Sequence, residues 1–170
     1  MIHMKKLTDL KDLMVEQLRD IYHAEKDLNE LLPKVIQQAN DPDLKKILDD
    51  YLHDNEGQIM RLRQVFERLY FQKRGETCEA MKAMIMEAKD MMKRSANSAV
   101  MDAGIITALQ HISHYEIAGY GAICTYANMM DDKNTSATIH KNLEEVKKMD
   151  RKLAKLAEEV INERAKSRVT

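Results

Sequence analysis

Apolar residues recur every three to four positions along most of the chain, a period typical of amphipathic α-helices. Short polar breaks such as NDPD, RSANS and DDKNTS interrupt this pattern. The pattern predicts helices over about residues 9–38, 42–70, 78–93 and 99–130, and a last helix that ends near residue 163. The chain is therefore predicted to be all-α.

Residues with strong capping preferences indicate where the helices begin. Thr8 is expected to cap the first helix, and Asp41 the second, because Pro42 follows it at the first helical position. Thr135 or Ser136 is expected to cap the last helix. One domain spanning residues 1–170 is expected, with frayed ends at residues 1–6 and 164–170.

The lengths of the connections predict how the helices are arranged. Tight turns join the first helix to the second and the fourth to the fifth, so each pair should form an antiparallel hairpin. A crossover of about 28 residues, with its own short helix, joins the two hairpins and can bring the fourth helix parallel to the second. This arrangement is the ferritin-like four-helix bundle; the long crossover argues against a simple up-down bundle.

Composition narrows the class of protein further. The net charge of −1 gives no basic field for nucleic acid or an anionic membrane. No secretory signal and no long uncharged apolar stretch is present, so we expect a cytoplasmic protein that binds neither membranes nor nucleic acid. Cys78 and Cys124 lack the spacing of a metal site and are interpreted as reduced thiols. The methionines of residues 78–93 are interpreted as packing residues.

Each long helix carries one acid within its apolar row: Glu25, Glu56, Glu116 and Asp150. Each acid lies about 14 residues from its interhelical turn, or roughly 20 Å, so the four acids are expected at one level of the bundle. Clustered buried acids repel one another unless a proton or a cation neutralises them. Three interpretations stay open: a present or ancestral metal site, a hydrogen-bond network of acids with Tyr and His, or a misread helical register.

Several segments resemble the YciF-like, ferritin-like proteins of the DUF892 family. They are EQLRDIYHAEKDLNELLPK (16–34), EGQIMRLRQVFE (56–67), CEAMKAMIMEA (78–88), HYEIAGYG (114–121) and MDRKLAKLAEEVIN (149–162). The resemblance covers nearly the whole chain. It implies a ferritin-like bundle related to rubrerythrin, a homodimer, a bacterial source and an association with stress responses.

The resemblance also implies a two-metal pattern, with Glu on the first helix, Glu-x-x-His on the second, Glu-x-x-Glu on the fourth and Glu-x-x-x-Asp on the fifth. Glu25, Glu116 and Asp150 match this pattern, and the second helix reads His53-x-x-Glu56 with the ligand types exchanged. Two carboxylate positions depart from it, because they hold Ser113 and Val146. The four carboxylates and one histidine that remain are expected to hold at most one iron, manganese or zinc ion, or none.

These observations favour a stress-associated protein with a degenerate metal site and no catalytic activity. Two alternatives remain: a metal-dependent oxidase or peroxidase of the rubrerythrin type, and a structural homo-oligomer whose core acids are hydrogen-bonded without metal. Tyrosines are suitable donors for such acids, and the candidates are Tyr22, Tyr115 and Tyr120. We expect His111 and His114 to be hydrogen-bonded or half-exposed rather than metal ligands.

Overall fold

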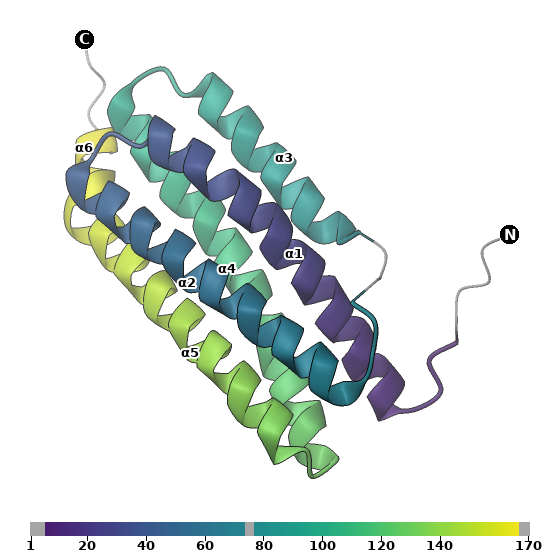
Figure 1. Ribbon diagram of the computed structural model, residues 1–170. Coiled ribbons are helices and arrows are strands. Elements are labelled where there is room, and N and C mark those ends of the chain that lie inside the picture. The colour runs from purple at the N-terminus through teal and green to yellow at the C-terminus, as the bar shows by residue number, and fades with distance from the viewer. Residues whose placement is uncertain (1–5, 74–76, 167–170) are drawn as a thin grey trace, which may run out of the picture.

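The computed structural model describes residues 6–73 and 77–166 (Figure 1). Its elements are α1 (Leu10–Gln38), α2 (Pro42–Leu69), α3 (Glu79–Arg94), α4 (Ser98–Met129), α5 (Lys133–Leu156), a π-helical turn η1 (Ala157–Ile161) and α6 (Asn162–Lys166). The described residues contain no strand. None of the helices they form is long and apolar enough to cross a membrane.

Four long helices form the bundle in two antiparallel hairpins, α1 with α2 and α4 with α5 (Figure 1). Helix α1 packs against α2 and α4, and α5 packs against the same two helices. Helices α2 and α4 run in the same direction, because the crossover that contains α3 returns the chain to the end where α2 begins (Figure 1). The predicted all-α bundle of two hairpins and a long crossover is confirmed.

Helix starts follow the predicted caps in one case and differ in two. Asp41 caps α2 as predicted, with its Oδ1 accepting from Asp43 N at 2.9 Å, and Pro42 is the first helical residue. Asp9 rather than Thr8 caps α1, because its carboxylate accepts from Asp12 N at 2.8 Å. Asp132 caps α5, so the prediction of Thr135 or Ser136 is wrong and both are buried in the first helical turn.

The buried carboxylate of Asp102, near the start of α4, fixes the relative height of the two hairpins. Its two oxygens accept from Asn40 N at 2.8 Å and Asp41 N at 2.9 Å, so it holds the α1–α2 turn from across the bundle. Arg164 Nη1 donates to Asp41 Oδ2 at 2.6 Å on the same turn. These contacts bring the starts of α2 and α4 together at one end of the bundle.

Arg164 also belongs to a segment for which we expected fraying. Residues 164–166 instead continue as α6, so this part of the prediction is wrong. The π-helical turn that precedes α6 keeps the chain helical past the end of α5. Residues 1–5 and 167–170 of the expected frayed ends lie outside the described residues.

Candidate functional site: a buried pair of glutamates

Two of the four predicted acids meet in the core. Glu25 comes from α1 and Glu116 from α4, both are fully buried, and the carboxyl group of each shifts the pKa of the other. Apolar residues of the same helical rows, such as Leu18, Leu28 and Leu109, are buried with them and carry the two acids inward. Two ionised carboxyl groups buried side by side would repel each other, and this repulsion favours a retained proton on the pair.

The electrostatics of the pair agree with this protonation. Burial raises the pKa of Glu116 well above its usual value, and the neighbouring charge of Glu25 raises it further. Burial also raises the pKa of Glu25, although donors from neighbouring side chains oppose the shift. Among the described residues, Glu116 Oε1, the oxygen that Tyr51 does not bind, has no hydrogen-bond partner.

Two tyrosines and one asparagine satisfy the other carboxyl oxygens. The Tyr51 hydroxyl donates to Glu116 Oε2, and the Tyr120 hydroxyl donates to Glu25 Oε1 at 2.5 Å. Asn55 Nδ2 donates to Glu25 Oε2 at 2.6 Å. Burial, followed by the charge of the glutamates, raises the pKa of both tyrosines well above the usual value, so their hydroxyls stay protonated donors.

Asp150 on α5 lies beside this pair without joining it. The half-buried carboxylate accepts from Ser113 Oγ at 2.8 Å and lies 3.2 Å from His114 Nε2. Its charge contributes to the raised pKa of Tyr51, which places it near the polar core. Ser113 stands where the two-metal pattern has a carboxylate. Its hydroxyl instead donates a hydrogen bond to Asp150.

The predicted positions of His53 and Glu56 in the core are wrong, because both residues are exposed. Helix α2 instead turns Tyr51, Asn55 and Gln58 inward, and all three are fully buried. The expected row through Leu52 and Glu56 follows the edge of the buried face rather than its centre. Of the four acids predicted to converge, only Glu25 and Glu116 therefore meet in the core, and Asp150 lies nearby.

A second polar layer lies towards the α4–α5 turn and was not anticipated from the sequence. Asn142 Oδ1 accepts from Arg61 Nε at 2.5 Å, and Arg61 also forms an ion pair with Glu145. A hydrogen bond from Asn142 lowers the pKa of Tyr120, which connects this layer to the glutamate pair. Polar residues at Asn55, Gln58 and Asn142, spaced along otherwise apolar rows, are the sequence signal that could have revealed it.

The predicted tyrosine and histidine roles are partly confirmed. Tyr120 is a donor to a core acid, whereas the Tyr115 hydroxyl donates to Asp20 and Tyr22 accepts from Arg63 Nε at 3.3 Å. His111 and His114 are exposed, and His114 pairs with Asp150.

The residues present do not fit the two-metal centre that the resemblance implies. Such a centre in a four-helix bundle draws glutamates and histidines from all four helices. Here the two core carboxyls accept hydrogen bonds from Tyr51, Tyr120 and Asn55, while the buried Val146 offers no ligand atom. The five predicted ligands, Glu25, His53, Glu56, Glu116 and Asp150, do not lie together, and a single bound ion stays a prediction.

Comparison with known proteins places the chain in a family. Residues 9–166 match the family described as a domain of unknown function, DUF892. The chain is 32% identical to protein YciF of Escherichia coli K12 over 160 residues, covering 94% of this chain and 96% of that protein.

Solved structures agree with this match. The crystal structure of the E. coli stress protein YciF has a TM-score of 0.87 at 32% identity, covering 92% of this chain and 99% of that one. YcfI of Rhodopseudomonas palustris, provisionally described as a structural protein, has a TM-score of 0.85 at 35% identity, covering 88% and 96%. A protein from Xanthomonas campestris at 15% identity, with a TM-score of 0.73, shares the fold and covers 94% and 100%.

Proposed function

Because the chain belongs to the DUF892 family, we propose that it is a stress-associated structural protein of the YciF type that catalyses no reaction. Its core acids are held by a shared proton and by hydrogen bonds rather than by metal ions. The observation that carries this proposal is the set of donors around the pair, in which Tyr51, Tyr120 and Asn55 occupy three of the four carboxyl oxygens.

The donor set supports a structural role for a chemical reason. Metal ions bind carboxylates in their deprotonated form, so binding would require the pair to lose its shared proton. It would also displace at least one tyrosine or asparagine hydrogen bond in a site without water-exposed ligands. Hydrogen-bonded carboxyl groups instead cross-link α1, α2 and α4, because Glu25, Tyr51 and Glu116 come from these three helices.

The relatives support the physiological part of the proposal. One is named a stress protein and another is provisionally described as a structural protein, and each covers most of this chain. The expected cytoplasmic location is consistent with both cysteines being free thiols.

We also propose that the chain forms a homodimer through the outer face of α4. Between Asp102 and Asp131 the only charged residue is the buried Glu116, although 32% of the whole chain is charged. Five exposed positions of this helix are uncharged: Thr107, His111, His114, Ala118 and Thr125. A Cβ atom added at Gly121 would meet nothing within 4 Å, so this face is open for close approach by a second copy.

Metal analysis of the protein purified from iron-supplemented cells tests the central proposal. We expect iron, manganese and zinc far below one equivalent per chain, and no rise in Tm when any of these ions is added. Two equivalents of iron per chain would overturn the proposal. One equivalent that is lost in Glu116→Gln but kept in the exposed control Glu56→Gln would replace it with the single-ion site.

A further inference from the structure

Helix α3 is held to the bundle differently from the other long helices. It lies outside the four-helix core, against α1 and α4 (Figure 1). Only Met81, Ile85 and Ala88 of its 16 residues are buried, whereas α1 and α4 each bury 11. Local stability follows the number of buried apolar contacts, so α3 is expected to be the least stably attached of the long helices.

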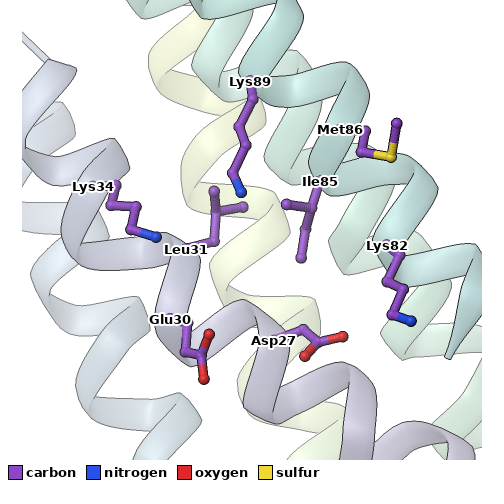
Figure 2. Close-up of a pocket in the computed structure, with 8 residues that line it drawn as sticks. All are labelled: Asp27, Glu30, Leu31, Lys34, Lys82, Ile85, Met86 and Lys89. Carbon is purple, nitrogen blue, oxygen red and sulfur yellow. The ribbon is translucent and has the colours of Figure 1, made fainter. Parts of the chain in front are cut away.

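Grooves run along both sides of α3. One, of about 260 Å³, lies between α1 and α3, where Lys34 and Lys89 reach in from opposite helices over Leu31 and Ile85 (Figure 2). The other, of about 550 Å³, lies between α3 and α4 and is lined in part by Met84 and Met91. The helix therefore contacts the bundle along a narrow strip between two open grooves.

Polar attachment of α3 to the bundle is concentrated at the residue that caps its start. Cys78 caps the helix, its Sγ accepting from Met81 N at 3.4 Å, and lies 3.0 Å from the Tyr115 hydroxyl of α4. Tyr115 in turn donates to Asp20 of α1. Within residues 6–73 and 77–166, the hydrogen bonds that join α3 and its cap to other helices all involve the Cys78 thiol, which contacts Tyr115 and lies near Asp20.

The surface beneath α3 is apolar. Leu31 and Val35 of α1, with Ile105 and Leu109 of α4, line a small void under Met91 and Met92. At its other end, α3 approaches α4 closely, since a Cβ added at Gly104 would lie 2.0 Å from Met91 Sδ. Methionine is a flexible packing residue, so this contact can form and break without distorting the backbone.

We propose that α3 is a cover that opens as a unit from an intact four-helix bundle and thereby exposes the apolar α1–α4 surface, with Cys78–Tyr115–Asp20 as its latch. The bundle does not need α3 for its own closure, because α1, α2, α4 and α5 already contact one another in a ring. Opening breaks the latch and the strip of apolar contacts while the buried glutamate pair stays covered by its own helices.

The two cysteines of the chain provide an internal comparison. Cys78 is buried under the latch, whereas Cys124 is buried between α4 and α5, where its Sγ lies 3.7 Å from Ser136 O. Burial raises the pKa of both thiols, so neither reacts until its surroundings open. Labelling of Cys78 therefore reports opening of α3, and labelling of Cys124 reports opening of the bundle.

The test is labelling of the native protein with an aromatic disulfide reagent at increasing urea below the unfolding transition. After correction for the rate of each thiol in unfolded chain, Cys78 should react at least about 100-fold faster than Cys124 in the absence of urea. The labelling rate of Cys78 should also change little with urea concentration. The logarithm of the labelling rate of Cys124 should instead rise with urea as steeply as the equilibrium constant of global unfolding does. Equal rates and equal slopes at both sites would overturn the proposal.

A second variant distinguishes opening of the whole helix from fraying of its first turn. Ala88→Cys, in a Cys78→Ser background, places a thiol at a buried position near the middle of α3, and serine preserves the cap. We expect it to label with the weak urea dependence of Cys78. Labelling only at the global unfolding rate would show that α3 frays at its start and would overturn the cover.

Discussion

The glutamate pair predicts how stability depends on pH. The pKa of Glu116 is raised well above that of the unfolded chain, so the folded protein keeps a proton that the unfolded chain releases above about pH 4.5. The stability contributed by this proton is therefore fully present below the unfolded pKa. It is lost as pH rises towards the folded pKa, by about 1.4 kcal/mol per pH unit for one retained proton.

Glu116→Gln removes this dependence with little change in shape. The amide oxygen can still accept from Tyr51, and the amide nitrogen can donate to Glu25 in place of the shared proton. Between pH 5 and pH 8, the free energy of unfolding of the wild type should fall relative to that of Glu116→Gln by up to about 4 kcal/mol.

Urea unfolding of both proteins at several pH values measures this difference. Other titrating groups cancel in the comparison, and Glu56→Gln serves as the control because Glu56 is exposed. The control should follow the wild type at every pH. If the wild type and Glu116→Gln change in parallel across the range, the pair holds no extra proton and the reasoning is refuted.

Three further changes test other parts of the structure. Tyr51→Phe leaves a buried oxygen of Glu116 without its donor and should cost about 1–3 kcal/mol in urea unfolding, whereas Tyr70→Phe, at a residue that is 95% exposed, should cost nothing measurable. Asp102→Ala removes the acceptor for two backbone N–H groups of the α1–α2 turn and should cost a similar amount, about 1–3 kcal/mol; an unchanged urea midpoint would count against that role. Ala118→Glu places a charge on the outer face of α4 and should convert the proposed dimer to monomer in light scattering, while Ala137→Glu on the exposed face of α5 should not; dimer in both variants would exclude this face.

The sequence predicted the fold well because connection lengths and apolar periodicity act locally. The turn at Asp41 and Pro42 has one strong cap, so α2 begins where expected. The end of α4 offers several capping residues in succession, and Asp132 rather than Thr135 provides the cap. Arg164 escaped prediction because its partner, Asp41, lies 123 residues away and only the folded bundle brings them together.

The site was predicted less completely for a reason specific to α2. Glu25 and Glu116 lie on rows of strongly apolar residues, so their inward direction could be derived from the sequence. On α2, two rows one residue apart both look apolar, and the polar Tyr51 and Asn55 made the correct one seem less buried. The prediction therefore placed Glu56 in the core, although this residue lies at the edge of the buried face. Burying the Asn55 amide and the Tyr51 phenol beside the two glutamates satisfies more hydrogen bonds.

The protonation state of the glutamate carboxyl groups tests the central claim most directly. Infrared spectroscopy of protein with isotope-labelled glutamate, treated with a chelator and held at pH 7, separates protonated carboxyl groups from ionised ones. We predict a protonated glutamate band that is present in the wild type and in Glu56→Gln and absent from Glu116→Gln. A wild-type spectrum in which every glutamate is ionised would contradict the account of a core held together by a shared proton.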